Sequence, residues 1–297
     1  MKHNLLSYFL AMVFVVPCFG DSVKDKHEQM LFPTVRIKTK RATGSGTIIY
    51  SSDRDEKNQF DTFVFTNHHV VDDAIRVEKR WNSLLRRNED KEVTDRVAVE
   101  VFNYQPQGTT AGRTVYDAEI VAYEPEEDIA LLRLTTPVRL KYVAKLIDRK
   151  RLVQLRMFNE VYAVGCSLGQ DPVASHGMLT GLSVIIAHRN YWMMSAPIIF
   201  GNSGGAVFVN IDGQHYFTGI PSRVGSTYNQ AVEHMAYFIP PTRIYSWLEK
   251  QRLTFLFDET VTPNESFDER RKLRQKSRHE PEGYESPSLT EDDIYGP

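Results

Sequence analysis

The sequence predicts an all-β fold, because short runs of alternating apolar residues recur from Leu31 to about Leu256. Examples are TVRIKTK, GTIIYSS, TFVFTNH, VAVEVFNY and IALLRL, each followed by residues that favour turns. Many short strands and few helical patterns are typical of a β-sandwich or a β-barrel. The 297 residues are 41% hydrophobic and 25% charged, which is ordinary for a globular protein.

The first segment of the chain predicts export. MKHNLLSYFLAMVFVVPCFGDS contains Lys2, an apolar run from Leu5 to Val16 and small residues near Gly20. This pattern is typical of a signal peptide over residues 1–20, cleaved after Gly20. The run is shorter than the about 18 residues expected of a membrane span, although an uncleaved anchor stays open as an alternative. We expect a periplasmic or secreted protein that touches a membrane only if this segment is retained.

Three later segments depart from the strand pattern. IPPTRIYSWLEKQRL predicts a helix after the last strand, since Ile244, Trp247 and Leu248 fall at helical spacing. Residues 78–96 are densely charged and indicate a short helical insertion between strands. This segment is expected to be either a solvated connection without a function of its own or a lid or docking surface. Residues 257–297 are polar and nearly free of aliphatic side chains, which predicts a disordered tail after one domain at residues 21–256.

Charge and cysteine usage exclude several classes of protein. The formal net charge is -2, so no overall field recruits nucleic acid. Cys166 would be the only cysteine left after removal of residues 1–20, which excludes an internal disulfide and predicts a small buried side chain. The histidines show no metal-ligand spacing, so we expect neither a metal nor a cofactor.

Ser203 stands in FGNSGGAVFVNIDG, which matches the G-x-S-x-G pattern of a nucleophile at a strand-to-helix turn. The residues that follow alternate and end in Asp-Gly, as in a β-hairpin. Ser203 is therefore expected to begin a strand, and this context excludes an α/β-hydrolase esterase.

A serine nucleophile needs an imidazole to take its proton and a carboxylate to orient that imidazole. FVFTNHHVV places His69 just after an apolar strand, and EPEEDIALLRL places Asp128 just before another. The chain order His69, Asp128, Ser203 differs from the serine-first order of α/β-hydrolases. His68 would point away from His69 on a strand, so we expect only one of them to face the site.

The motifs T-N-x-H-V-V, D-I-A-L-L and G-N-S-G-G resemble the three signatures of the trypsin-like serine proteases. GSGTIIY, VYAVGCSLGQ and HMAYFIPPTRI resemble the Deg/HtrA branch of that family, over roughly Leu31 to Leu248. The resemblance implies a chymotrypsin-like fold of two six-stranded antiparallel β-barrels with a C-terminal helix. It also implies His69 as general base, Asp128 as its orienting carboxylate and Ser203 as nucleophile. The backbone N–H groups of Gly201 and Ser203 would form the oxyanion hole.

The sequence departs from the family pattern in two ways that concern regulation. Asn202 precedes the serine where chymotrypsin-like zymogens have an activating aspartate, so we expect control by loop ordering instead. Only about 45 residues follow the helix near Trp247, which is too few for the PDZ domain usual in the Deg/HtrA branch. We therefore expect no PDZ domain within this chain.

The substrate pocket is expected to be apolar. The family places its floor just before the serine and its opposite wall on the strand near TGIPSRVG. Neither segment offers a carboxylate for Lys or Arg, which favours small or medium aliphatic residues. The residues expected to line the pocket are Ala196, Pro197, Ile198, Gly219 and Ile220.

Together these observations predict an exported serine endopeptidase that cleaves unfolded or flexible proteins through an acyl-enzyme. Its partners would be protein or peptide substrates and not nucleic acid. Trimers are common in the family, so a homo-oligomer stays open. The alternative is a catalytically silent protein of the same fold with a binding or structural role.

Overall fold

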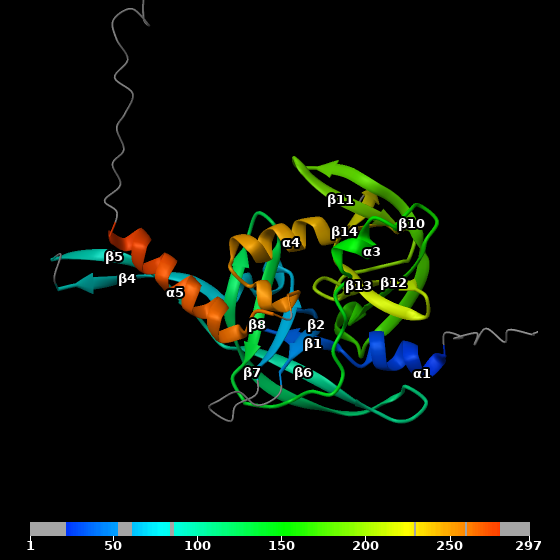
Figure 1. Ribbon diagram of the computed structural model, residues 1–297, viewed down its shortest axis with the longest axis horizontal. Coiled ribbons are helices and arrows are strands. Elements are labelled where there is room, and N and C mark those ends of the chain that lie inside the picture. The colour runs from blue at the N-terminus through cyan, green and yellow to red at the C-terminus, as the bar shows by residue number, and fades with distance from the viewer. Residues whose placement is uncertain (1–21, 53–60, 84–85, 229, 259, 280–297) are drawn as a thin grey trace, which may run out of the picture.

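The computed structural model describes residues 22–52, 61–83, 86–228, 230–258 and 260–279, and over these the chain forms two closed six-stranded barrels side by side (Figure 1). The predicted signal peptide at residues 1–20 lies outside the described residues. The all-β prediction with two antiparallel barrels is confirmed.

The first barrel has the strand order β1-β2-β3-β8-β7-β6, and neighbouring strands are antiparallel. Its strands are β1 (Thr34–Lys38), β2 (Thr43–Ser51), β3 (Thr62–Thr66), β6 (Val97–Tyr104), β7 (Thr110–Glu124) and β8 (Ile129–Leu134). Strand β3 is buried along its whole length and β8 at every residue except Arg133, so these two strands form the centre of the barrel.

The second barrel has the strand order β10-β11-β14-β13-β12-β9. Its strands are β9 (Glu160–Gly165), β10 (Val173–Ile186), β11 (Arg189–Met194), β12 (Ala206–Ile211), β13 (Gln214–Thr227) and β14 (Gln230–Ile239). Strands β12 and β13 form the hairpin predicted after Ser203, joined at Asp212 and Gly213.

One apolar cluster runs between the barrels. Phe65 of the first barrel stacks on Phe217 of the second, with ring centroids 5.8 Å apart. Helix α4 (Pro241–Lys250) follows β14 and places the buried Trp247 6.4 Å from Phe65. The predicted C-terminal helix is therefore confirmed, and it ties the end of the second barrel to the first.

Apart from α5 (Pro263–His279), the remaining helices are short. They are α1 (Val23–Lys26), η1 (His27–Leu31), α2 (His68–Val71), η2 (Asp72–Ala74), α3 (Arg149–Leu152), η3 (Ser167–Gly169) and η4 (Thr254–Leu256).

The helical prediction for the charged insertion is wrong. Strands β4 (Ile75–Asn82) and β5 (Arg87–Thr94) pair as an antiparallel hairpin that projects from the first barrel (Figure 1). Ile75, Val77 and Trp81 fall on one face, two and four positions apart, which fits strand periodicity. This alternation begins at Ile75. The helical prediction considered only residues 78–96 and therefore did not include the start of the alternation. Residues 84–85, between these two strands in the sequence, lie outside the described residues.

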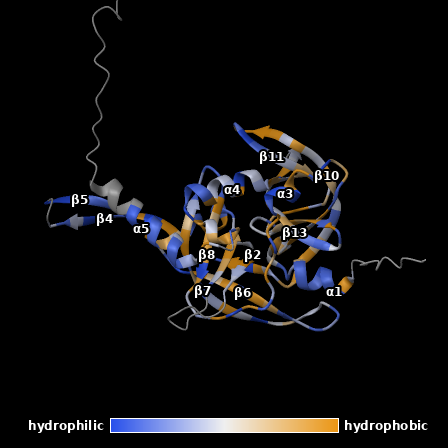
Figure 2. Ribbon diagram, in the orientation of Figure 1, coloured by the Kyte–Doolittle hydropathy of each residue, from blue (hydrophilic) through white to orange (hydrophobic). Residues whose placement is uncertain are grey.

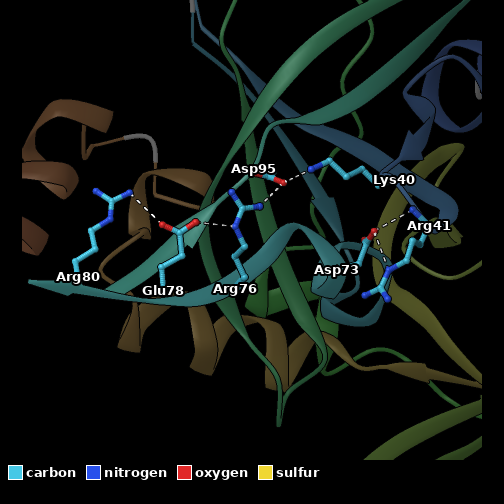
Figure 3. A network of polar contacts seen from close by, with 7 residues as sticks. All are labelled: Lys40, Arg41, Asp73, Arg76, Glu78, Arg80 and Asp95. Carbon is cyan, nitrogen blue, oxygen red and sulfur yellow. Dashed lines mark hydrogen bonds and ion pairs between the residues drawn. The ribbon is translucent and has the colours of Figure 1, made fainter. Parts of the chain in front are cut away.

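Ion pairs hold the root of this hairpin against the barrel (Figure 3). Asp95 accepts a hydrogen bond of 2.5 Å from Arg76 and one of 2.8 Å from Lys40. Arg76 also donates to Glu78 over 3.0 Å. The hydrogen bond from Arg76, followed by the one from Lys40, lowers the pKa of Asp95 to about 2. The hairpin root is therefore an exposed network of charges.

The prediction of a disordered tail from residue 257 is corrected over helix α5 (Pro263–His279). Thr262 and Glu265 form a capping box, in which the Thr262 N–H donates to the Glu265 carboxylate over 2.8 Å and the Glu265 N–H donates to the Thr262 hydroxyl over 3.3 Å. Phe267 is the single aromatic anchor, with its ring 5.9 Å from that of Phe63. Residues 280–297 lie outside the described residues.

Hydropathy follows the two barrels, whose strands carry most of the hydrophobic residues, whereas α5 and the hairpin are mostly hydrophilic (Figure 2). Over the described ranges, no helix has both the length and the apolar character that crossing a bilayer requires.

We expect Phe267→Ala to detach helix α5 from the barrel. The ring is partly buried and also packs on Phe255 and beneath Arg133, so its loss should lower the free energy of unfolding by about 1.5–3 kcal/mol. Urea denaturation measures the change, and hydrogen exchange over residues 264–272 should become faster. Glu269→Ala on the exposed side of the helix is the control and should change stability by less than about 0.5 kcal/mol.

Candidate active site

His69 and Asp128 form a direct pair. His69 lies on helix α2 just after β3, and its Nδ1 lies 2.9 and 3.0 Å from the two carboxylate oxygens of Asp128. The backbone N–H of His69 also donates to Asp128 Oδ1 over 3.1 Å. The carboxylate is 13% exposed and the imidazole 46%. An ionised carboxylate requires the proton on Nδ1, which leaves Nε2 as an acceptor on the open side.

The turn that carries Asp128 is held in an unusual backbone conformation. Asp128 has φ of +57°, a left-handed value that costs energy in a residue with a side chain. The Asn67 side-chain amide donates to the Asp128 carbonyl over 2.8 Å. Arg243 of helix α4 donates to the Glu127 carboxylate over 2.7 Å and to the Glu127 carbonyl over 3.0 Å. These contacts hold the turn from the first barrel and from helix α4.

Ser222 on β13 is a site residue whose contact with Asp128 the sequence did not reveal. Its hydroxyl donates to Asp128 Oδ2 over 2.7 Å. Burial opposes the charge on Asp128, but the hydrogen bonds from His69 and Ser222 more than offset it, so the pKa of Asp128 lies below its ordinary value. The carboxylate is therefore ionised at neutral pH and stays so in mild acid.

Ser203 and His69 line one pocket of about 450 Å³ between the barrels. Ser203 comes from the turn before β12, in the second barrel, whereas His69 and Asp128 come from the first. In the part of the chain that the structure describes, no hydrogen bond joins the Ser203 hydroxyl to the His69 ring. Such contacts between a nucleophile and its base are often long without substrate and shorten when substrate binds.

The turn of residues 200–203 aims one backbone N–H away from its neighbours. The Leu168 N–H donates to the Phe200 carbonyl over 2.6 Å. A trans peptide directs its carbonyl and its N–H to opposite sides. Anchoring the Phe200 carbonyl therefore directs the Gly201 N–H to the other side of the turn.

The same argument applies to the N–H of Ser203. The Gly205 N–H donates to the Asn202 carbonyl over 3.0 Å, which fixes the peptide unit that contains the Ser203 N–H. Among the described residues, neither this N–H nor that of Gly201 donates to a protein acceptor. The turn thus leaves free the two donors expected for an oxyanion hole.

Two glycines permit the close packing of this turn. Gly201 has φ of +96°, and a Cβ there would lie 2.4 Å from the Cys166 carbonyl oxygen. Gly204 has φ of +83°, and its Cβ would lie 2.2 Å from the Ser45 carbonyl oxygen. Neither position accepts a side chain without movement of the backbone.

Asn202 uses its uncharged amide to close the turn. Its Oδ1 accepts hydrogen bonds from the Ser167 hydroxyl over 2.8 Å and from the Ile199 N–H over 3.1 Å. The residue is buried, and its side-chain oxygen is satisfied by these two donors within the chain.

The pocket is apolar but is built mainly from other residues than those expected. Of the expected set, Ile198 lines it, whereas Ala196, Gly219 and Ile220 are buried elsewhere in the second barrel and Pro197 is exposed. The residues that line it are His69, Ile186, Ile198, Ile199, Phe200, Ser203, Ser222, Arg223, Val224 and Tyr237. No Asp or Glu is among them.

Three neighbouring residues have roles that the structure defines. His68 stacks on Tyr123 with ring centroids 5.4 Å apart, and burial lowers the pKa of His68. Glu126, two residues before Asp128, is exposed and pairs with Arg189 over 2.7 Å. Cys166 is buried at the end of β9, where burial raises the pKa of its thiol to about 12 and makes it unreactive.

Sequence comparison places the chain near known peptidases. A model of the trypsin-like peptidase domain matches residues 44–220, more than half of the chain. The chain is 26% identical over 200 residues to the periplasmic pH-dependent serine endoprotease DegQ of Escherichia coli, covering 66% of this chain and 33% of that protein. It is 27% identical over 177 residues to the periplasmic serine endoprotease DegP of Salmonella typhimurium, covering 58% and 28%. The chain thus spans about a third of the length of these relatives.

Solved structures support the fold at lower identity. The HtrA-type protease AlgW with a tripeptide is 16% identical, with a TM-score of 0.53 over 80% of this chain and 64% of that one. The MamO protease domain of Magnetospirillum magneticum, in its apo form, is 16% identical, with a TM-score of 0.51 over 75% of this chain and 98% of that one.

We expect Arg243→Ala to loosen the Asp128 turn. The guanidinium is largely buried and donates to Glu127 twice and to the Asn190 carbonyl, so its loss should lower the free energy of unfolding by about 2–4 kcal/mol. Arg243→Lys should not restore it, because an ammonium cannot reach three acceptors in a fork. Chemical denaturation measures both variants. Lys250→Ala, exposed on the same helix, is the control; an equal loss there would contradict a specific role for Arg243.

Proposed function

Because the chain belongs to the trypsin-like peptidase family, we propose that it is a serine endopeptidase that forms an acyl-enzyme on Ser203. One observation carries the proposal: His69, which is paired with Asp128, lines the same pocket as Ser203. A binding protein has no physical need for a buried carboxylate that orients a half-exposed imidazole beside a serine.

In the proposed reaction, His69 Nε2 takes the proton of the Ser203 hydroxyl as the serine oxygen attacks the substrate carbonyl carbon. The resulting imidazolium is stabilised by the ionised Asp128. It then gives its proton to the leaving amine as the peptide C–N bond breaks. Water attacks the acyl-enzyme in the second half, with His69 again accepting and returning one proton, and Ser203 is regenerated.

The free N–H groups of Gly201 and Ser203 would stabilise the oxyanion of both tetrahedral intermediates. Their carbonyl partners are already anchored, so the donors are oriented before substrate arrives and need little rearrangement during the reaction. Removal of one such donor typically costs about 100- to 1,000-fold in rate.

We assign unfolded or flexible protein chains as substrates. A strand-like peptide segment must enter the pocket between the barrels, which a tightly folded protein cannot supply. The matched relatives are named as periplasmic endoproteases, which supports export of this chain and protein or peptide substrates. A homo-oligomer is included in the proposal only because oligomers are common in the family.

The proposal predicts covalent labelling of the enzyme by a fluorophosphonate at Ser203. Ser203→Ala should abolish labelling, and Asp128→Asn should slow peptide turnover by about 10,000-fold because the imidazole would then hold the wrong tautomer. Intact mass and fluorogenic peptide turnover measure the two effects. Ser195→Ala, which changes a serine outside the pocket, is the control for labelling and should not alter it.

The contrary outcome is specific. A well-folded wild-type domain that resists the probe across pH 5–9, also with denatured protein added, would favour the catalytically silent alternative. The lack of a hydrogen bond between Ser203 and His69 in the described residues is the one observation in its favour.

The pocket predicts cleavage after aliphatic residues. Ile198, Ile199 and Val224 offer apolar contacts, and no carboxylate among the lining residues can pair with Lys or Arg. In a fluorogenic series that varies only the residue before the scissile bond, Val, Leu or Ala should exceed Lys and Asp by at least about tenfold in kcat/KM. A preference for Lys would show that another surface selects the substrate.

A further inference from the structure

We infer that Ser45, in the first barrel, is a positioning residue for the oxyanion turn, which its hydroxyl holds from across the boundary between the barrels. This inference rests on the proposed function, because it concerns the same turn of residues 200–203. Ser45 lies on β2 and touches neither the pocket nor the reacting atoms.

The Ser45 hydroxyl stands in a chain of hydrogen bonds between two segments of the second barrel. The Cys166 N–H donates to Ser45 Oγ over 2.7 Å. The hydroxyl in turn donates to the Gly201 carbonyl over 2.5 Å. Since the oxygen already accepts from Cys166, its own proton is directed toward Gly201.

The backbone of Ser45 holds the other end of the turn. Its N–H donates to the Ser203 carbonyl over 2.8 Å, and its carbonyl accepts from the Thr66 hydroxyl over 2.7 Å. With the Leu168 and Gly205 contacts, each of the four carbonyls from residue 200 to residue 203 has a donor. Ser45 supplies two of these four donors.

The hydrogen bond from the Ser45 hydroxyl is the most important of these contacts because its acceptor is the carbonyl of a glycine, Gly201. Gly201 adopts a positive φ, and glycine moves between backbone conformations at less cost than any other residue. Rotation there would change the direction of the Gly201 N–H relative to the Ser203 N–H. The Ser45 hydroxyl restrains the carbonyl of this one flexible residue, so its removal should disorder the oxyanion donors without touching the substrate.

Thr47 provides a matched control on the same strand. Ser45 and Thr47 lie two residues apart on β2, and both are 0% exposed. The Thr47 hydroxyl is buried and makes no hydrogen bond to any residue that the structure describes. Thr47→Val therefore removes a buried hydroxyl with no effect on the turn, whereas Ser45→Ala removes one that is used twice.

The experiment compares Ser45→Ala, Ser45→Thr and Thr47→Val with the wild type in the full chain. With a fluorogenic peptide, Ser45→Ala should lower kcat about 10- to 100-fold with KM within about twofold, because the lost restraint acts in the transition state. Ser45→Thr keeps the hydroxyl and should recover most of kcat. Thr47→Val should leave kcat unchanged.

Hydrogen exchange over residues 199–205 gives a readout that does not need activity. In Ser45→Ala this exchange should quicken at least about tenfold relative to Thr47→Val, while peptides from β3 and β8 stay unchanged. If Ser45→Ala and Thr47→Val have equal kcat and equal hydrogen exchange over these residues, the inference is wrong. A wild type that neither turns over nor labels refutes the proposed function; the exchange comparison then decides about Ser45 alone.

Discussion

The position of one barrel against the other is the constraint on which the rest of the site depends. The proposed general base, His69, and its carboxylate, Asp128, come from the first barrel and the proposed nucleophile, Ser203, from the second, so no single barrel contains the candidate site. Phe65, Phe217 and Trp247 fill the space between the barrels and remove apolar surface from water, which drives their association. This packing is not directional. The polar contacts of Ser45 and Arg243 add the orientation that apolar packing cannot supply.

Local sequence patterns were enough to predict the barrels, and they led to the proposal of His69, Asp128 and Ser203 as the catalytic residues. Alternating apolar runs identify strands because side chains on a strand point to opposite faces, and each proposed catalytic residue adjoins such a run. The roles of Ser222 and Arg243 could not be predicted in this way. Each contacts a residue about a hundred positions away in the sequence, and a local pattern carries no information about such contacts. Helix α5 does have a local sequence signal, the capping box of Thr262 and Glu265. The polar composition of the segment nevertheless led to a prediction of disorder.

The pocket shows the limit of carrying positions over from a family. Its apolar character was predicted from composition, yet the expected wall at Gly219 and Ile220 lies within the second barrel. The residues that line the pocket, Ser222 to Val224, follow a few positions later on the same strand. Strand β13 has irregular pairing with β14 at Pro221 and Arg223, and a bulge changes which side chains face the cleft. Irregular pairing has no reliable signature in one sequence.

The exposed charges around Asp95 give the hairpin a sensitivity that the buried centre lacks. Dissolved ions screen the interaction between exposed charges beyond a distance of about 10 Å at 0.1 M ionic strength, and this distance becomes shorter at higher ionic strength. Lys40 and Arg76 therefore hold the hairpin most firmly in dilute solution. The hydrogen bonds of Ser45 lie out of reach of those ions. A change in salinity would thus alter the periphery of this protein while leaving its centre as it is.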